Sequence, residues 1–145
     1  MSKTKSPVQF HFLSPCTLNG RGALKAFIAR MLRKKGLAVE AVSVVFCDDK
    51  YLLDLNRQFL HHDFYTDILS FPLSASGEPL IAEIYISTER VRENALNVHV
   101  SLNKELHRVI FHGILHFCGY EDKSPADIKK MRSIEDKWLK AYFKE

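Results

Sequence analysis

Hydrophobic residues recur along the chain with two different periods, which separates the expected strands from the expected helices. Residues 8–14 alternate loosely and are rich in strand formers, so they predict a first strand. Residues 41–47 form a nearly continuous apolar, β-branched run, which is typical of a strand buried on both faces. Residues 68–72 and 80–87 predict two more strands, and the short turn segment between them favours an antiparallel hairpin.

Helical periodicity fills the segments between and after these strands. Residues 22–35 place apolar side chains on one stripe, and Gly36 is expected to end this helix. A second helix begins at Asp48 or Asp49, either of which can cap it, and runs to about residue 60. Three further helices are expected over residues 88–99, 102–118 and 125–143.

The last two of these helices differ in how much of their surface is apolar. The helix over 102–118 is apolar on nearly all sides from Val109 to Cys118, which is typical of a central, buried helix. The final helix begins with a serine cap and a proline at its first position. Its inner side is expected to carry Ile128, Met131, Ile134, Trp138 and Tyr142.

This order of elements predicts an α+β fold, with a single domain over residues 1–145. We expect a four-stranded mixed sheet packed by about five or six helices, with the central buried helix across it. No repeat, linker or low-complexity segment divides the chain. The right-handed crossover rule makes the first two strands parallel if they are neighbours.

The central helix carries the candidate chemistry, a His-x3-His-x2-Gly-x2-Asp pattern. His112 and His116 are four residues apart, so on a helix both imidazoles lie on one face. Gly119 can adopt a left-handed conformation and end the helix, and the chain can then bring Asp122 to the same point. Two histidine nitrogens, a carboxylate oxygen and an open fourth position form a catalytic zinc site. The sequence therefore predicts one Zn²⁺ ion on His112, His116 and Asp122.

Other readings of these residues fit less well. Leaving a buried imidazole unpaired costs about 1–3 kcal/mol, whereas a metal satisfies both histidines at once. Asp122 could instead be a surface carboxylate beside a turn. His107 lies about 140° from His112 around the helix, and Cys118 about 200° from His116, so neither is expected to be a ligand.

Composition and charge mainly indicate the cellular compartment of the protein. The chain is 46% hydrophobic and 26% charged, and no apolar run is long enough to span a bilayer. The first seven residues lack the apolar core of a secretory signal, and the three cysteines form no C-x-x-C pair. We therefore expect a cytoplasmic protein with free thiols. The net charge of +4 mildly supports a polyanionic partner.

Two further polar clusters have alternative interpretations. Arg33, Lys34 and Lys35 crowd the last turn of the first helix, where cations suit the helix dipole. A solvated face is the favoured interpretation of this run, and a phosphate-binding patch is the alternative. Residues 61–67 hold two histidines and two carboxylates, but their adjacency fixes no preformed geometry. We expect there a polar loop near the active site rather than a second metal site.

The histidine spacing also resembles that of metzincin proteases, H-E-x-x-H-x-x-G-x-x-H. The glutamate after the first histidine is the general base of those enzymes, and Gly113 occupies that position here. A metzincin-like zinc protease is therefore an alternative function rather than the favoured one.

Longer motifs point to a different family. Residues 112–120 resemble the H-G-x-L-H-L-x-G-Y-D-H signature of the YbeY family. Residues 55–72 resemble its L-N-x-x-Y-R-x-x-D-x-x-T-D-V-L-S-F-P segment, and residues 82–87 its G-D-I-x-I-S strand. These matches span about residues 48–122 and follow the family's order.

The resemblance implies a zinc-dependent, single-strand-specific endoribonuclease that acts in 16S rRNA 3′-end maturation and ribosome quality control. It implies RNA and the small ribosomal subunit as partners, with ribosomal proteins or a GTPase as further candidates and no membrane. A non-catalytic ribosome assembly factor with a structural zinc ion is another alternative.

Three departures from the family pattern affect the expected site. Asp122 takes the place of the family's third histidine ligand. Leu60 takes the place of an arginine, so another cation is needed if that arginine holds phosphate. Ala82 and Glu83 replace glycine and aspartate in the strand, which is a milder change.

Four side chains near the motifs are candidates for contact with the substrate. Arg57, His61 or Lys123 would replace the missing arginine at the phosphate, because they lie close to the motifs in sequence. Ser70 is the candidate catalytic residue, as a hydrogen-bond donor to a bound phosphate or water, and a structural serine is the equal alternative. The expected reaction is hydrolysis of an RNA phosphodiester by a metal-activated water, or attack by the ribose 2′-OH.

Overall fold

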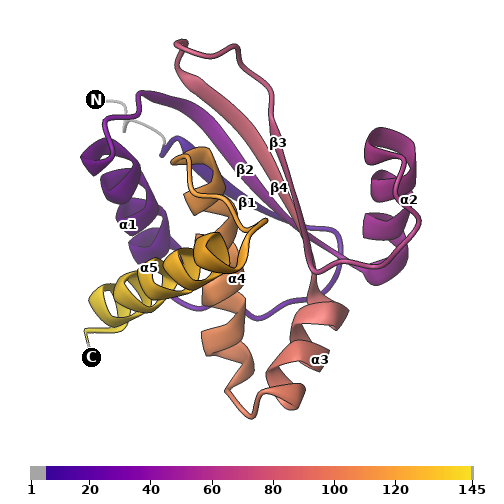
Figure 1. Ribbon diagram of the computed structural model, residues 1–145. Coiled ribbons are helices and arrows are strands. Elements are labelled where there is room, and N and C mark those ends of the chain that lie inside the picture. The colour runs from indigo at the N-terminus through magenta and orange to yellow at the C-terminus, as the bar shows by residue number, and fades with distance from the viewer. Residues whose placement is uncertain (1–5, 145) are drawn as a thin grey trace.

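The computed structural model describes residues 6–144, which form one α+β domain (Figure 1). The strands are β1 (Val8–Phe12), β2 (Val39–Cys47), β3 (Ile68–Pro72) and β4 (Leu80–Ser87). The helices are α1 (Arg21–Lys34), α2 (Asp49–Leu60), α3 (Thr88–Asn97), α4 (Leu102–Phe117) and α5 (Pro125–Phe143). The predicted fold class is confirmed. Residues 1–5, part of the segment in which we expected no secretory signal, lie outside the described range.

The sheet has the strand order β1-β2-β4-β3 and is mixed. Strands β1, β2 and β4 are parallel neighbours, whereas β3 pairs antiparallel with β4 and forms one edge. Both predictions about strand direction, the parallel first pair and the antiparallel hairpin, are confirmed. Among residues 6–144, none of the helices combines the length and apolar character that crossing a membrane requires.

The first strand is shorter than predicted. It ends at Phe12 rather than at residue 14. The backbone amides of Leu13 and Ser14 both donate to the carbonyl oxygen of Phe46, so the chain leaves the regular ladder there.

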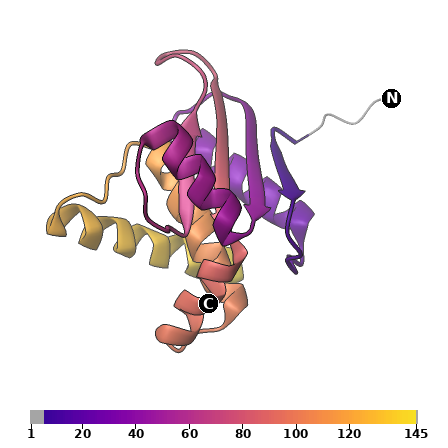
Figure 2. The same ribbon diagram turned by 90° about the vertical axis from the view of Figure 1, so that its right-hand side faces the viewer.

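The helices cover the two faces of the sheet unequally. Helices α1, α4 and α5 lie on one face, and α2 lies alone over the other, as Figures 1 and 2 show. The main core lies between the sheet and the three-helix face, and a small second cluster of Cys47, Leu52 and Leu69 lies beneath α2. Functional side chains on α4 are therefore on the opposite side of the sheet from α2.

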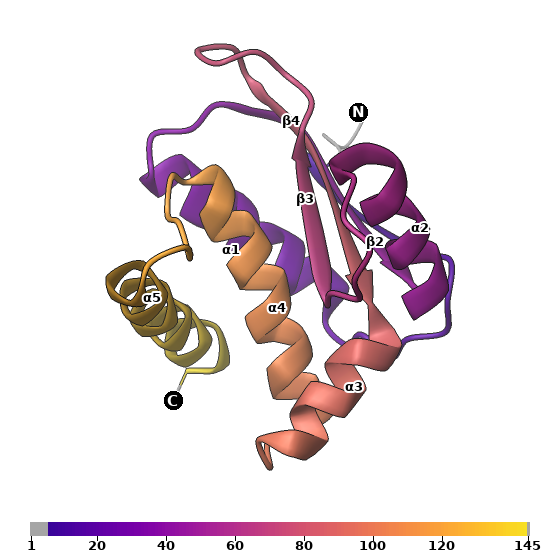
Figure 3. The ribbon, with the colours of Figure 1, turned by 45° about the vertical axis from the view of Figure 1, so that its right-hand side comes forward.

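Gly113 explains how closely α4 approaches the sheet. A Cβ atom at this position would lie 2.8 Å from Cδ1 of Ile68 and 3.1 Å from Cδ1 of Ile84. Since Ile68 is in β3 and Ile84 in β4, the glycine lets the helix rest on the hairpin. This contact places α4, the helix that holds His112 and His116, beside the edge strand (Figure 3).

Helix α5 packs across α4 but not along its whole length. Met131 and Trp138 are buried as predicted, at 2% and 3% exposure, and Ile134 and Tyr142 pack partly against the core. The prediction for Ile128 is wrong, because its side chain is 53% exposed. Ile128 lies in the first turn of α5, which extends over a surface depression instead of meeting the core.

Candidate metal centre

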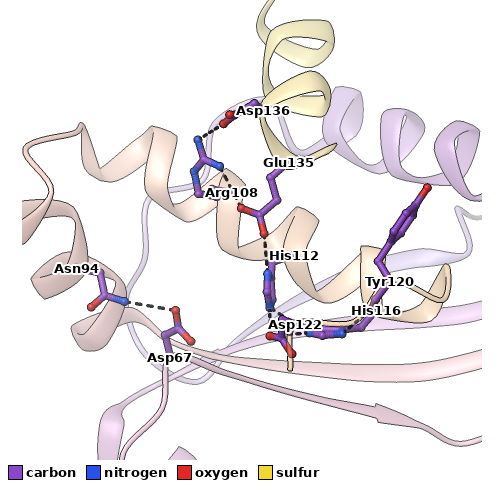
Figure 4. Close-up of polar contacts among 9 residues, drawn as sticks. All are labelled: Asp67, Asn94, Arg108, His112, His116, Tyr120, Asp122, Glu135 and Asp136. Atoms are coloured by element: carbon purple, nitrogen blue, oxygen red, sulfur yellow. Dashed lines mark hydrogen bonds and ion pairs between the residues drawn. The ribbon is translucent and has the colours of Figure 1, made fainter. Parts of the chain in front are cut away.

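Three side-chain atoms converge at the end of α4. Nε2 of His112 lies 3.0 Å from Nε2 of His116 and 3.1 Å from Oδ2 of Asp122. Nε2 of His116 lies 3.4 Å from the same carboxylate oxygen. Gly119 has a φ of 95° and ends the helix in the left-handed conformation, so the following residues return Asp122 to the histidines (Figure 4). This is the convergence that the sequence pattern predicts.

Each imidazole is oriented through its other nitrogen. Nδ1 of His112 donates a hydrogen bond to Oε2 of Glu135 at 2.6 Å. Nδ1 of His116 donates to the carbonyl oxygen of Tyr120 at 3.0 Å, because a carbonyl oxygen only accepts. In the tautomer with the proton on Nδ1, each ring presents the Nε2 lone pair to Asp122.

The chemistry of this donor set fits a divalent metal ion. A tetrahedral site with zinc–ligand distances of about 2.0–2.1 Å has ligand atoms about 3.3 Å apart. The three distances between Nε2, Nε2 and Oδ2 are 3.0, 3.1 and 3.4 Å. Among the described residues, His112, His116 and Asp122 are the one group with this arrangement of potential ligand atoms. Two lone pairs and a carboxylate directed at one point need a cation between them.

Glu135 is held by one cation and by burial. Its side chain is on α5, is 5% exposed, and receives a hydrogen bond from Nη1 of Arg108 at 3.0 Å. Nη2 of the same guanidinium donates to Oδ1 of Asp136 at 2.6 Å. The chain Asp136–Arg108–Glu135–His112 thus joins α5 to the candidate ligand on α4 (Figure 4).

Burial and charge act in opposite directions on His112. Burial lowers the pKa of this imidazole, but the hydrogen bond to Glu135 and the charges of Glu135, Asp122 and Asp67 raise it, and the net shift is upward. The same negative environment that favours an imidazolium favours a metal cation.

A depression of about 330 Å³ opens beside the three ligand side chains. Its lining includes His112, Asp122 and Glu135 together with Asp67, the residue before β3. Burial raises the pKa of the Asp67 carboxyl, whose Oδ2 accepts a hydrogen bond from Asn94 at 3.3 Å. The depression lies between α4, α5 and the residue before β3, so the metal centre faces an accessible surface.

The predicted substrate residues lie in different places. Ser70 is on the edge strand, on the same face as Ile68 and thus toward α4, and its hydroxyl bonds no other described residue. Lys123 is exposed and lines a smaller depression together with His116 and Asp122. The structure therefore brings Ser70 and Lys123 to the α4 side of the sheet.

Arg57 and His61 lie at the end of α2, on the opposite face of the sheet. The Arg57 guanidinium forms ion pairs with Asp63 and Asp54. His61 is exposed and caps α2 in the left-handed conformation. Neither side chain is brought to the candidate metal centre.

The residues that we set aside as ligands lie elsewhere. Nδ1 of His107 bonds the carbonyl oxygen of Asn103, and its ring stacks on Tyr142. All three cysteines are free, and Cys118 is outside the ligand group. In the 61–67 loop, His62 stacks on Phe64 and no second three-ligand group forms among residues 6–144.

Sequence reasoning missed Glu135 and Arg108. Glu135 occurs in an amphipathic helix and Arg108 just before the apolar stretch of α4, and charged residues in such positions usually face solvent. A carboxylate on the stripe that also holds Met131 and Trp138 was the available signal, because an unpaired buried charge is unfavourable and implies a partner.

Comparison with known proteins identifies the family of this chain. A family profile described as "Endoribonuclease YbeY" matches residues 19–143. The chain belongs to the YbeY endoribonuclease family. A protein of that name from Flavobacterium johnsoniae is 37% identical over 138 residues, which covers 95% of this chain and 99% of the relative. Another from Flavobacterium psychrophilum is 52% identical over 101 residues, or 70% of this chain and 71% of the relative.

A solved structure supports the fold. A solution structure of a Thermotoga maritima protein matches with a TM-score of 0.61 and 28% identity. The match covers 92% of this chain and 89% of that one. The protein is thus a YbeY-type hydrolase whose substrate class is RNA and whose His112, His116 and Asp122 form a candidate metal site.

Proposed function

We propose that this YbeY protein is a zinc-dependent, single-strand-specific endoribonuclease that acts in the cytoplasm. Its proposed role is maturation of the 16S rRNA 3′ end and ribosome quality control, with the small ribosomal subunit as its partner. The observation that carries the proposal is the convergence of two Nε2 atoms and one carboxylate oxygen within 3.4 Å of one another. Mixed histidine and carboxylate ligation favours zinc.

The residues of the chain have distinct parts in this proposal. His112, His116 and Asp122 would hold the ion, which supplies Lewis acidity and lowers the pKa of a bound water to about 7. Glu135 and the Tyr120 carbonyl keep both imidazoles in the tautomer that leaves Nε2 free.

Two more side chains would contact the RNA. The Ser70 hydroxyl lies on the α4 side of the edge strand and bonds no residue among 6–144, so it can donate a hydrogen bond to a phosphate oxygen. Of the three candidate phosphate contacts near the motifs, Lys123 is the one beside the ligands and is the contact that we retain. Arg57 is engaged by two carboxylates, and His61 is on the far face.

The packing of Gly113 argues against a protease. A glutamate there would supply the protease general base. The Cβ direction at this position, however, leads into Ile68 and Ile84 of the sheet and not into a cleft. A carboxylate could not reach a substrate from this position without displacing the β3–β4 hairpin.

The test compares wild-type protein with His116→Ala and Asp122→Ala variants. Metal content, cleavage of single-stranded and double-stranded RNA, and cleavage of casein are measured on the same preparations. We expect zinc in the wild type, cleavage of single-stranded RNA alone, and loss of zinc and cleavage in both variants. Full RNA cleavage after metal removal would contradict the proposal.

The same variants separate a nuclease from an assembly factor. If they fold, bind the small subunit and support growth with normal 16S rRNA ends, the protein acts without cleavage. Accumulation of 16S rRNA with an unprocessed 3′ end in cells that carry only the variants supports the nuclease.

A further inference from the structure

Tyr120 contacts two lysines from distant parts of the chain. Nζ of Lys35, at the C-terminal cap of α1, donates a hydrogen bond to the Tyr120 hydroxyl at 2.6 Å. The same Nζ lies 4.9 Å from the centre of the Tyr120 ring, and Nζ of Lys130 on α5 lies 5.7 Å from it. We call these three residues the Tyr120 cluster. In Figures 1 and 3 the end of α1 lies beside the turn that follows α4.

The positive charge of this cluster is not neutralised within the described part of the protein. Lys35 and Lys130 form no ion pair there. Glu121 and Asp127 line a depression with Lys130, yet neither carboxylate comes within ion-pair distance of its ammonium group. Two cations held against one ring repel each other, so the arrangement favours an anion from outside.

The cluster is continuous with the metal centre. The carbonyl oxygen of Tyr120 accepts the hydrogen bond from Nδ1 of His116, while its ring extends away from the three ligand side chains (Figure 4). Tyr120 also lines the small depression that holds His116, Asp122 and Lys123. A strand of phosphates that passes the metal centre would therefore reach the two lysines.

We propose that Lys35 and Lys130 bind the sugar-phosphate backbone of single-stranded RNA on nucleotides that flank the cleaved bond. The inference rests on the proposed function, because it assumes that RNA enters the metal centre. Regularly spaced phosphates complement separated ammonium groups, and lysine binds phosphate as a point charge. The basic end of α1 is then a binding surface and not merely a solvated helix end.

The test measures the salt dependence of binding to metal-loaded protein. The probe is a single-stranded 2′-O-methyl oligoribonucleotide, followed by fluorescence anisotropy and checked on a gel to be intact. Lys35→Gln and Lys130→Gln should each reduce the slope of log K against log salt by about 0.7, and the double variant by about 1.4. Lys35→Arg should keep the wild-type slope because it keeps the charge.

Lys50→Gln is the matched control, because Lys50 is an exposed lysine on α2, on the opposite face of the sheet. Its slope should equal that of wild type, and metal content should be the same in all variants. An unchanged slope in the Lys35/Lys130 double variant overturns the inference. The inference is also overturned if the double variant loses binding to polyglutamate but keeps wild-type binding to the RNA probe, since the partner is then an acidic protein. Slopes reduced as expected in a protein that cleaves no RNA support this surface and contradict the proposed nuclease activity.

Discussion

Glu135 of α5 and His112 of α4 are joined by a 2.6 Å hydrogen bond between Oε2 and Nδ1. Glu135 is buried, and its other carboxylate oxygen accepts a hydrogen bond from Arg108. The last helix therefore supplies no metal ligand but determines which nitrogen of a ligand carries the proton. Carboxylates in this position fix ring orientation and raise the basicity of the ligand.

Replacement of Glu135 should weaken metal binding without removing a ligand. Glu135→Gln keeps the shape but loses the charge, so zinc affinity should fall by about 10–100-fold. The measurement is competition with a chromophoric chelator.

Asp136→Asn is the control for that variant, because Asp136 also bonds Arg108 but does not touch His112. Its zinc affinity should stay near that of wild type. Equal affinities for Glu135→Gln and Asp136→Asn would mean that the contact to His112 has no influence on the metal.

Substitutions at Asp122 should separate ligand chemistry from charge. Asp122→His restores the third histidine of the family pattern and should still bind one zinc ion per chain. Asp122→Ala leaves two ligands and should lose the stoichiometric ion, because three protein ligands are the usual minimum of a catalytic site. Metal analysis after gel filtration checks both. Stoichiometric zinc in Asp122→Ala would exclude Asp122 as a ligand.

Gly113→Ala should destabilise the protein although alanine is the better helix former. Overpacking against Ile68 and Ile84 costs about 1–3 kcal/mol. The gain in helix propensity, about 1 kcal/mol, offsets only part of it. The free energy of unfolding from urea titration measures the net loss.

Gly22→Ala provides the comparison, since Gly22 is helical and a Cβ there meets no atom within 4 Å. This variant should be as stable as wild type or more stable. If both alanine variants had the same stability, the contact between α4 and the hairpin would not be tight.

His107 should make stability fall at acidic pH. Burial lowers the pKa of this imidazole, although its hydrogen bond to Asn103 opposes the shift, and no described atom pairs with its buried Nε2. Below the unfolded pKa of about 6.5, the His107 imidazole binds a proton in the unfolded chain but stays neutral in the folded chain until the pH reaches its lower folded pKa. Stability from this residue is therefore present above pH 6.5 and is lost as pH falls toward the folded pKa.

His107→Phe should remove this part of the pH dependence and keep the aromatic packing against Tyr142 and Phe143. Urea titrations on either side of pH 6.5 measure it, with His11→Gln at an exposed site as control. An identical fall in stability on acidification in wild type and His107→Phe would show that another group is responsible.

The sequence by itself determined the features that depend on neighbouring residues. Helical spacing placed His112 and His116 on one face, and Gly119 reversed the chain toward Asp122, because backbone geometry repeats within a turn. The antiparallel pairing of β3 and β4 also followed from the sequence, because a short connection lets consecutive strands pair only in opposite directions.

Only the tertiary structure decided which distant residues meet these. Glu135 is 23 residues from His112, and Lys35 is 85 residues from Tyr120. Their contacts depend on how α1 and α5 pack beside α4 on one face of the sheet. The same packing places Arg57, on α2, on the face of the sheet opposite the metal centre, and exposes Ile128 to solvent. Periodicity tells which side of a helix is apolar, but the neighbour that covers it is set by long-range packing.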